Sequence, residues 1–522
     1  MISDDRAALA RSRLAEVVAV LAMATDLGLG LPTEHTIRVC LLAVNLGRRA
    51  GLTESQLSDL YYLTLLRMLG CTVASNYHAE MFGDEVAFAH DTQHLDYGDP
   101  QAFGSWAMQS FGADQPSDVR AGMIEKLFTY TPQRRQENLL EHCEVARMLA
   151  TRLHLTESVI EGVGYAFERW DGTGVPYGVG GEDLPVIVRV MSLCNELEIH
   201  YRLGGPEATE AMARQRSGTA FDPALVRLFC ARRDSVLSVI DGPTVWADVL
   251  AAEPGDPWML MPAELVNVAA VMGDFADLKS GYLAGHSGAV GALVVEAANQ
   301  IGLGDEDRPA LEIAALAHDL GRVGVTTAIW DKPGPLNDSE WEKVRLHPYY
   351  SERLLTKAAA TQAAGRIAGM HHERPDGSGY HRGAPRAAQP ITARLLAAAD
   401  AHVALRSARA HRPEVGLDRA GATLRRMATD ERLDPVAVNA VLAAVGDHGP
   451  QVRRTWPAGL TDREVDVLRR IALGGSIKDA AGDLHVAAKT VDFHLQNIYA
   501  KTGVTTRAAA TLFAVQNDLL DV

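Results

Sequence analysis

Cysteine is scarce in this chain, and the few cysteines have no metal-binding spacing. Five occur among 522 residues, all in the first half of the sequence, and no two of them form a CxxC pair. An odd number of cysteines without a disulfide framework is typical of a protein from a reducing cytosol. We therefore expect neither a cysteine-based zinc site nor a disulfide-stapled secreted domain.

Long apolar runs and an excess of positive charge are also missing. No apolar segment approaches the ~18–20 residues that span a bilayer, and the acidic start of the chain lacks the layout of a signal peptide. Lys and Arg number 50 against 66 Asp and Glu, which gives a formal net charge of −16. We expect a cytoplasmic protein without a membrane partner, in which any contact with nucleic acid comes from a local patch.

What is present is helical sequence almost throughout. Ala, Leu, Arg and Glu dominate, apolar residues recur at spacings of three and four, and no strand-rich region stands out. Residues 311–317 are apolar on nearly all sides, which predicts a buried helix. The length allows two to four domains at roughly 100–200 residues each. We expect an all-α protein.

One module occurs twice in the sequence. The segment at His35 resembles the segment at His286, and the run Glu-Arg-Trp-Asp-Gly-Thr-Gly around Gly172 resembles Glu-Arg-Pro-Asp-Gly-Ser-Gly around Gly377. The offset is 251 residues for the first pair and 205 for the second. Copy one therefore contains about 46 additional residues, which we place between residues 71 and 136.

Copy two concentrates side chains that can bind metal ions. They are His286, His318, Asp319, His347, His371, His372 and Asp400. Imidazoles and carboxylates together suit divalent iron, manganese or zinc. Neighbouring residues on one helix diverge by about 100°, so His318 and Asp319 can serve different ions, or Asp319 can bridge them. The pattern predicts a dinuclear metal centre.

Copy one has lost most of this set. Arg67 and Met68 stand where copy two has its His-Asp pair, Asn195 stands where it has its last aspartate, and the His-His pair is replaced by Ala-Phe. Only His35 and His142 remain, and two isolated imidazoles do not hold a metal pair. We interpret copy one as a degenerate domain with structural histidines.

Copy two resembles the HD-GYP family of metal-dependent phosphohydrolases, which cleave cyclic di-GMP, over residues 265–449. The signatures that match are His318-Asp319-x-Gly321, Lys332-Pro333-Gly334 with Glu340, His347-Pro348, His371-His372-Glu373 with Asp376-Gly377-x-Gly379-Tyr380, and Ala393-Arg394 leading to Asp400. The resemblance implies that the seven side chains above are metal ligands. Some members use a glutamate for a third metal, but Tyr282 occupies that position, so we expect two divalent ions, iron or manganese.

The resemblance also implies roles for residues around the centre. A water activated by the two ions would attack phosphorus in line, with Asp319 and Arg322 as catalytic residues and Arg322 stabilising the developing charge. Arg322 stands in place of the signature lysine, and a surface salt bridge is the alternative for it. Five further residues are expected at the substrate. They are the cations Arg409 and Arg412, which can pair with phosphates, and the loop residues Asp376, Gly377 and Tyr380. His381 replaces the proline of the GYP triplet.

The last segment, residues 460–522, resembles the LuxR-type helix-turn-helix domain. It carries a Leu-Thr-x-Arg-Glu start and a Lys-Thr-Val-x-x-His core. The resemblance implies DNA contacts by Lys489, Thr490, His494 and Lys501. Seven Lys and Arg against eight Asp and Glu leave the segment at about −1, so weak DNA binding by a homodimer is expected, and use in dimerisation or protein contact is the alternative.

The sequence thus predicts two tandem HD-type helical domains followed by a small helix-turn-helix domain. The expected boundaries are 1–250 for the degenerate copy, 264–449 for the metal-dependent copy, 450–459 for a linker and 460–522 for the DNA-binding domain. We expect a DNA-binding regulator that hydrolyses cyclic di-GMP or a related cyclic dinucleotide. The alternatives are a weak or inactive enzyme that senses nucleotides as a transcription factor, and an HD phosphohydrolase of another nucleotide.

Overall fold

The protein is built from helices, as the computed structural model shows for residues 12–73, 75–113, 115–129, 132–452, 456–473, 475–517 and 519–520. These described residues contain three isolated β-bridges and no strand. The prediction of an all-α protein is confirmed. None of the described helices is long and apolar enough to cross a membrane.

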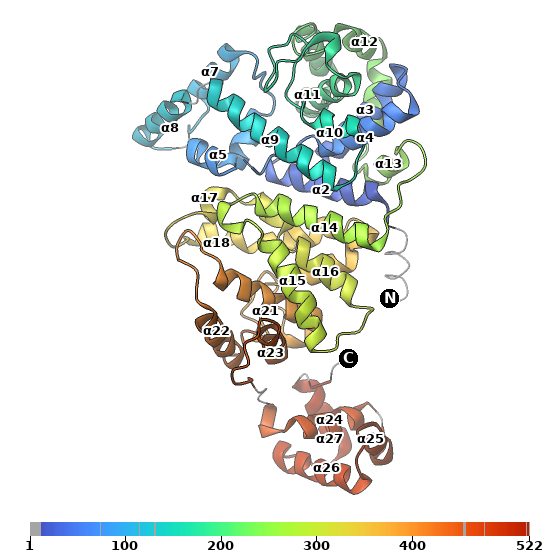
Figure 1. The fold of residues 1–522 in the computed structure, drawn as a ribbon, viewed down its shortest axis with the longest axis vertical. Helices are drawn as coiled ribbons and strands as arrows, with labels where there is room; N and C mark the ends of the chain where they lie inside the picture. The colour runs from blue at the N-terminus through green and yellow to red at the C-terminus, as the bar shows by residue number, and fades with distance from the viewer. Residues whose placement is uncertain are drawn as a thin grey trace.

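Copy one forms the upper body in Figure 1. Its helices are α2 (Leu14–Gly28), α3 (His35–Arg49), α4 (Glu54–Leu66), α9 (Pro132–Arg152), α10 (Glu157–Val163), η1 (Gly181–Asp183), α11 (Val186–Gln215), α12 (Pro223–Leu237), η2 (Ser238–Ile240) and α13 (Trp246–Ala251). Helix α4 starts at a capping box, in which the side chains of Thr53 and Gln56 each bond the other's backbone amide. Gly205, at φ 73°, interrupts α11 where a proline follows.

Four helices occupy the place of the additional residues in copy one. They are α5 (Ser75–Phe82), α6 (Glu85–Thr92), α7 (Pro100–Gln109) and α8 (Ser117–Thr129). They have a small apolar core of their own, in which the rings of Phe82 and Phe88 stack at 3.7 Å and Trp106 and Phe111 pack beside them. This insertion projects to one side of copy one (Figure 1).

Copy two lies directly below copy one in Figure 1. Its helices are α14 (Pro262–Asp277), η3 (Gly281–Leu283), α15 (His286–Gln300), α16 (Arg308–Ala317), η4 (Leu320–Gly324), α17 (Thr327–Trp330), α18 (Asp338–Arg345), α19 (His347–Leu355), η5 (Ala359–Thr361), α20 (Gln362–Ala368), η6 (Arg386–Ala388), α21 (Ile391–Arg406), α22 (Leu417–Thr429) and α23 (Pro435–Ala444). The buried helix predicted over residues 311–317 is the C-terminal part of α16.

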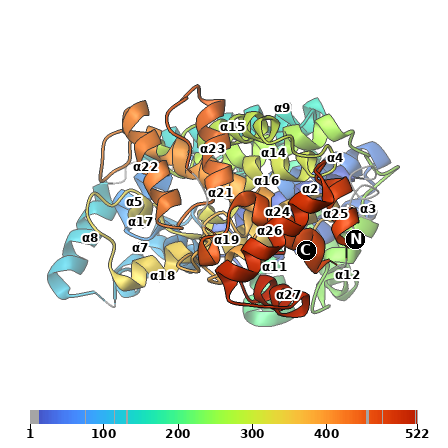
Figure 2. The same ribbon diagram turned by 90° about the horizontal axis from the view of Figure 1, so that it is seen from below.

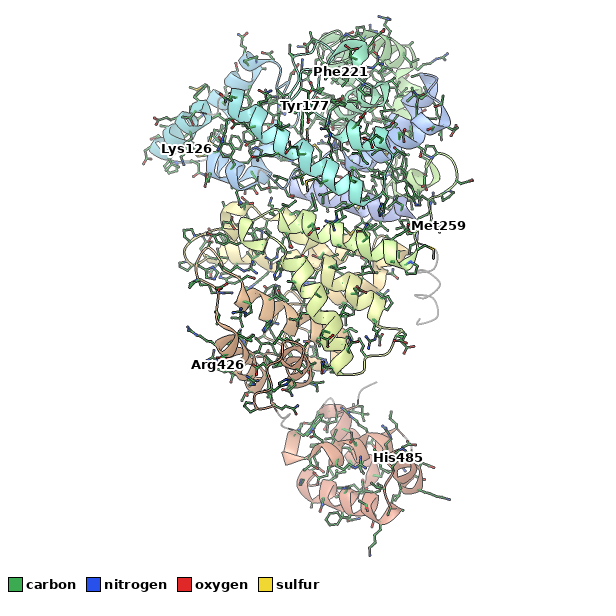
Figure 3. The ribbon with its side chains drawn as sticks, viewed as in Figure 1. Lys126, Tyr177, Phe221, Met259, Arg426 and His485 are labelled. Carbon is green, nitrogen blue, oxygen red and sulfur yellow. The ribbon has the colours of Figure 1, made fainter. Side chains whose placement is uncertain are left out.

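The two copies share one hydrophobic core. Helix α2 is buried along almost its whole length and packs against η4 and α19 of copy two, so it contacts both bodies. The segment between the copies pairs with the start of α2, because the Leu14 amide donates to the Trp258 carbonyl at 2.9 Å and Met259, labelled in Figure 3, faces Arg13. Buried leucines contribute about 1.5–3 kcal/mol each, so this shared core makes the copies one folding unit.

The C-terminal helices form a separate small body at the bottom of Figure 1, seen in front in Figure 2. They are η7 (Pro457–Gly459), α24 (Asp462–Ala472), α25 (Ile477–Asp483), α26 (Ala488–Thr502) and α27 (Arg507–Gln516). Thr461 and Glu464 form a capping box at α24. Trp456 is buried in this core and donates to the Asp462 carboxylate at 2.6 Å, so the structural unit begins four residues before the predicted boundary at 460.

Candidate metal centre

The seven metal-competent side chains of copy two converge although they come from five places in the chain. His286 begins α15, His318 and Asp319 follow α16, and His347 begins α19. His371 and His372 follow α20, and Asp400 lies within α21. Six of the seven are buried, and His372 is partly exposed. The fold therefore gathers these side chains in the interior of copy two.

Asp319 lies at the middle of the group. Its Oδ2 is 3.1 Å from His318 Nε2 and 3.6 Å from His286 Nε2. Its Oδ1 is 3.4 Å from the Nε2 atoms of both His347 and His371. One carboxylate thus faces two sets of imidazoles, one set on each oxygen.

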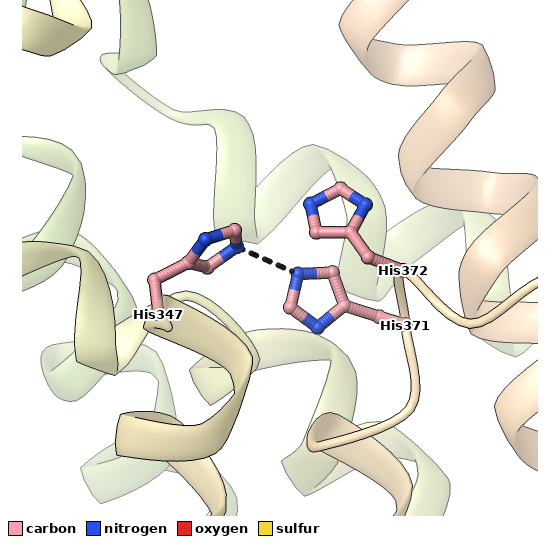
Figure 4. A group of neighbouring side chains, drawn as sticks. All are labelled: His347, His371 and His372. Atoms are coloured by element: carbon pink, nitrogen blue, oxygen red, sulfur yellow. Dashed lines mark hydrogen bonds between the residues drawn. The ribbon is translucent and has the colours of Figure 1, made fainter. Parts of the chain in front are cut away.

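One group of three possible ligands lies on each side of Asp319, and a third group, made of His318, Asp319 and His371, joins the two. Asp400 Oδ1 lies 3.2 Å from His286 Nε2 and 4.0 Å from His318 Nε2, which completes the first group. The second group is His347, His371 and His372, drawn in Figure 4, where the Nε2 atoms of His347 and His371 are 3.1 Å apart. Asp400 Oδ2, 4.0 Å from His372 Nδ1, also reaches toward this second group.

The chemistry of these atoms fits divalent metal ions. Both ring nitrogens of His286, Nε2 of His318, both oxygens of Asp319 and Oδ1 of Asp400 are buried without a hydrogen-bond partner. Such atoms are rare in folded proteins because burial without a partner costs about 1–3 kcal/mol. An ion on each side of Asp319 would satisfy these atoms apart from one ring nitrogen of His286.

Three imidazoles are oriented by their second nitrogen. Nδ1 of His318, His347 and His371 donates to the carbonyls of Ala315, Val344 and Ala368, respectively, at 2.6–2.8 Å. A carbonyl only accepts, so Nδ1 carries a proton and Nε2 faces the centre as the atom that can bind a metal ion. This is the arrangement that ligating histidines have in metalloproteins.

Burial and charge set the protonation of the centre. Burial lowers the pKa of His347 to about 4, which keeps it in the neutral form that binds metal. Burial opposes ionisation of Asp319, but Arg322 and His318 outweigh it and hold the pKa of this carboxyl well below its usual range. Burial likewise opposes a charge on His318, but Asp319 and Asp400 raise its pKa to about 9. A metal at His318 therefore competes with a proton.

Arg322 is part of the centre. It is buried, and its Nε lies 2.7 Å from Asp319 Oδ2. The alternative of a surface salt bridge is therefore wrong, because the ion pair is inside the protein. The guanidinium lies over the ring of Trp330, 4.7 Å from its centroid. Trp330 belongs to no sequence motif. It reaches Arg322 because it is the last residue of α17, and the way this helix packs cannot be inferred from the sequence.

Two of the five residues expected at the substrate lie near the centre. Tyr380 packs on His372 with ring centroids 4.8 Å apart. Arg409 is half-buried, and burial together with repulsion from Arg322 lowers its pKa to about 10. Arg374, which sequence reasoning missed, lies close enough to Asp400 to interact with its charge, and burial lowers the pKa of this guanidinium. Its position directly after the His371-His372-Glu373 run was the available signal.

The other three residues expected at the substrate serve the local backbone. Arg412 donates to the carbonyls of Ala404, Leu405 and Ser407 at the end of α21, so its guanidinium is occupied there. Asp376 is exposed and accepts from the backbone amide of Ser378 at 2.9 Å, and Gly377 has φ 77° in the same turn. Gly377 thus needs the left-handed conformation that glycine allows. Contact of these residues with a substrate stays a prediction.

The corresponding place in copy one has a different chemistry. His35 Nδ1 pairs with Glu198, and its Nε2 lies 3.3 Å from Asn195 Oδ1, so His35 is a satisfied structural histidine. His142 packs edge-on against Phe167 at 4.9 Å. Arg67 is buried at the place that His318 has in copy two. Within the described part of the chain, groups of three or more residues that could hold a metal ion occur only in copy two.

The predicted DNA-contacting residues lie on α26 of the C-terminal body. Lys489 is exposed at its start, and Thr490 and His494 are half-buried. Lys501 Nζ is 2.7 Å from the buried carboxylate of Glu464, so this ammonium is engaged within the domain. Lys489 is the more available cation of the two.

Comparison with known protein families gives the chain's relationships. The model of the HD domain matches residues 115–225 and 270–436, together more than half of the chain. The chain belongs to the HD domain family. The match includes part of copy one, so the HD protein carries the module twice. A second model, bacterial regulatory proteins of the luxR family, matches residues 458–514.

Curated relatives of this HD protein are phosphodiesterases. It is 29% identical over 418 residues to 3'3'-cGAMP-specific phosphodiesterase 3 of Vibrio cholerae, covering 78% of this chain and 89% of that protein. It is 38% identical over 148 residues to the cyclic di-GMP phosphodiesterase response regulator RpfG of Xanthomonas campestris, covering 28% of this chain and 39% of the relative.

A solved structure shares the same architecture. The crystal structure of a cyclic GMP-AMP specific phosphodiesterase of V. cholerae, V-cGAP3, matches with a TM-score of 0.58 and 27% identity, over 84% of this chain and 98% of that one. The resemblances to the HD-GYP family and to the LuxR-type domain that the sequence motifs indicate are thereby confirmed.

Proposed function

We propose that copy two hydrolyses a phosphodiester bond of a cyclic dinucleotide at a centre of two divalent metal ions. The observation that carries the proposal is the pair of three-ligand groups on either side of Asp319. The expectation of a phosphodiesterase is confirmed at the level of enzyme class by the relatives. Cyclic di-GMP and 3'3'-cGAMP are the substrates that the relatives' names suggest.

Each ion would be held by its own group of three side chains. His286, His318 and Asp400 would hold one ion, His347, His371 and His372 the other, and Asp319 would contact both. Two divalent ions, iron or manganese, would supply Lewis-acid activation of water and of the phosphoryl group. Tyr282 supports a count of two, because its phenol replaces the carboxylate that a third ion would need.

Cations around the centre would receive the substrate's phosphates. Arg322 faces Asp319 from inside the protein, and Arg409 approaches from the loop after α21. Arg374 adds a third guanidinium close to Asp400. Positive groups placed where charge develops stabilise the transition state, and their effect is stronger in a buried site than in water. We assign Arg322 to this role.

The test replaces the carboxylate that lies between the two groups of ligands. In Asp319→Ala we expect loss of bound manganese and at least a ~10³-fold fall in kcat for cyclic di-GMP or 3'3'-cGAMP, because both ions lose a shared ligand. The matched control is His142→Ala, which removes one of the two imidazoles that remain in copy one and should keep metal content and kcat. If the metal-loaded wild-type protein turned over neither substrate, the proposed function would be wrong.

The C-terminal domain supports a second activity in the same chain, namely DNA binding through α26. We infer that Lys489 contacts phosphate, whereas Lys501 stabilises the domain through Glu464. Lys489→Ala should weaken DNA binding and reduce its salt dependence by about one unit of slope. Lys501→Ala should chiefly lower the melting temperature of the domain. Equal effects of both variants on DNA affinity with unchanged stability would contradict this division.

A nucleotide-sensing transcription factor remains the second candidate function. Its support is the ion pair between Arg322 and Asp319, since a guanidinium held by the central carboxylate is less available to a leaving group. DNA affinity measured with and without cyclic di-GMP, on the non-hydrolysing Asp319→Ala protein and on wild type, separates the two. An effect of the nucleotide on operator affinity without turnover in wild type favours sensing.

A further inference from the structure

Helix α17 is a four-residue helix of copy two that touches copy one at one end and the metal centre at the other. It begins after Thr326 and ends at Trp330. It packs against α5 of the insertion in copy one. Because four residues make about one helical turn, contacts that fix the start of α17 also fix the position of its last residue, Trp330.

The N-terminal end of α17 is held by a carboxylate from the other copy. Glu85, the first residue of α6, accepts from the Thr327 amide at 2.9 Å and from the Thr326 hydroxyl. The same carboxylate lies 2.8 Å from Nζ of Lys279. Lys279 is 1% exposed and Glu85 is 7% exposed, so the ion pair is buried between the copies.

Lys279 adds a second connection to the same turn. Its carbonyl accepts from the Thr327 hydroxyl at 3.0 Å. The start of α17 is therefore tied to Glu85 by amide and hydroxyl and to the Lys279 segment by a side-chain bond. Charge-assisted hydrogen bonds of this kind are stronger and shorter than neutral ones.

The C-terminal end of α17 carries Trp330 into the metal centre. Its indole Nε1 donates to the Arg322 carbonyl at 3.2 Å, and its ring lies under the Arg322 guanidinium. The same ring meets His347 edge-on, with centroids 5.5 Å apart and planes at 79°. Trp330 thus contacts one cation and one possible metal ligand, and both of these contact Asp319.

We propose that Glu85 of copy one is a positioning residue for the catalytic centre of copy two, acting through α17 and Trp330 on Arg322 and His347. The proposal rests on the proposed function for its effect on turnover. It gives the degenerate copy a role in catalysis without a metal site of its own. A shift of about 1 Å at a catalytic group costs on the order of 100-fold in rate. Contacts that fix the position of Arg322 are therefore expected to raise kcat.

The experiment uses the full chain loaded with manganese. Glu85→Gln keeps the shape of the side chain and removes its charge, and Trp330→Phe keeps a ring but loses the indole N–H. Glu80→Gln is the matched control, because Glu80 is an exposed carboxylate on the neighbouring helix α5. The measurements are amide hydrogen exchange of residues 320–331, manganese per chain, melting temperature, and kcat and KM for cyclic di-GMP or 3'3'-cGAMP.

In Glu85→Gln we expect amide exchange in residues 320–331 to rise about tenfold or more. We expect kcat to fall about tenfold or more while KM changes less than about twofold and manganese per chain is retained. Trp330→Phe should lower kcat in the same way, and Glu80→Gln should match wild type. Unchanged exchange in residues 320–331 of Glu85→Gln would overturn the proposal.

A second variant separates positioning from stability. Glu85→Gln leaves Lys279 buried without its partner, which destabilises the fold, whereas Glu85→Gln with Lys279→Met removes both charges. We expect the double variant to regain the melting temperature but not kcat. Recovery of both would mean that Glu85 only stabilises the fold. If the wild-type protein shows no turnover, the proposed function fails, and the exchange of residues 320–331 still decides whether Glu85 holds α17.

Discussion

The two copies of the HD module have the same scaffold and different centres. His286 begins α15 after Gly285 at φ 75°, and His35 begins α3 after Glu34 at φ 73°. The buried Asp277 accepts from the Ser287 amide at 2.8 Å, and Asp26 accepts from the Thr36 amide at 3.0 Å. The backbone geometry and these supporting bonds are shared, although only copy two has the metal-competent set.

The difference lies in how the buried polar atoms are satisfied. In copy one, Glu198 pairs with His35, so the imidazole has a partner from the protein. In copy two, the imidazole of His286 has no hydrogen-bond partner, and carboxylates approach it from Asp319 and Asp400. The same helical scaffold thus surrounds an ion pair in copy one and a group of metal-competent side chains in copy two, and the difference depends on a few residues.

The largest effect is expected when the centre of copy two is given the residues of copy one. The double variant His318→Arg with Asp319→Met reproduces Arg67 and Met68. We expect loss of both metals and at least a ~10³-fold fall in kcat, with helical content retained, because copy one shows that the scaffold accommodates this pair. Metal analysis, circular dichroism and phosphodiesterase assays check it.

The reverse exchange in copy one is the control. Arg67→His with Met68→Asp should not create a metal site, because Phe167 and Asn195 still replace ligands. Metal bound by copy one in that variant would show that the two centres differ less than their side chains indicate.

A buried aspartate that caps a helix in each copy should stabilise copy two by about 1–2 kcal/mol more than copy one. Asp434 caps α23 and pairs with Arg386 and with Arg394 at 2.7 Å, whereas Asp222 caps α12 and pairs with Arg189 at 2.8 Å. We expect Asp434→Asn to cost about 3 kcal/mol and Asp222→Asn about 1–2 kcal/mol, because the first variant removes a buried carboxylate from two half-buried guanidinium groups and the second removes one from a single guanidinium. Urea unfolding of the full chain measures both.

The pH dependence of Asp434 follows from its charge. Burial raises the pKa of this carboxyl, but Arg386 and Arg394 outweigh burial and lower it below its usual value. The stabilisation is therefore complete above the unfolded-state pKa of about 3.9 and is lost as the pH falls through the lower folded-state pKa. The difference between wild type and Asp434→Asn should shrink below about pH 4. A difference that grows on acidification would contradict the ion pair.

Removal of metal should destabilise the protein through copy two alone. A ligand present at 100 times its dissociation constant stabilises the folded state by about 2.7 kcal/mol, so chelation should lower the melting temperature of the manganese-loaded wild type by several degrees. The His318→Arg, Asp319→Met variant should show no such shift. A chelation shift that persists in this variant would place a metal outside the predicted centre.

The sequence predicts the repeat and the seven metal-competent residues because both are local motifs with fixed spacing. It does not predict the contact of Trp330 with Arg322, because that contact depends on how α17 packs against η4 in the folded chain. Glu85 is likewise outside any motif, because its partner Lys279 lies in the other copy. The family resemblance and its charge predict that Arg412 meets phosphate, but its bonds to carbonyls at the end of α21 depend on the fold and are not visible in the sequence.

The smallest effect on stability, and the sharpest test of a shared scaffold, concerns one glutamate in each copy. Glu373 accepts from the amides of Arg382 and Ala384 at 2.7 and 2.8 Å. Glu168 accepts from the amides of Tyr177 and Val179 at 2.7 and 3.1 Å. Glutamine offers one acceptor oxygen instead of two, so Glu373→Gln and Glu168→Gln should each cost about 1–2 kcal/mol.

Their effects on turnover should differ, because only the loop held by Glu373 carries Tyr380 onto His372. We expect Glu373→Gln to lower kcat about tenfold and Glu168→Gln to leave it unchanged. Equal losses of stability with unequal losses of kcat would mean that the copies share a loop-supporting bond and only copy two uses the loop at a reacting centre. Equal losses of kcat would instead mean that copy one influences turnover through its own loop.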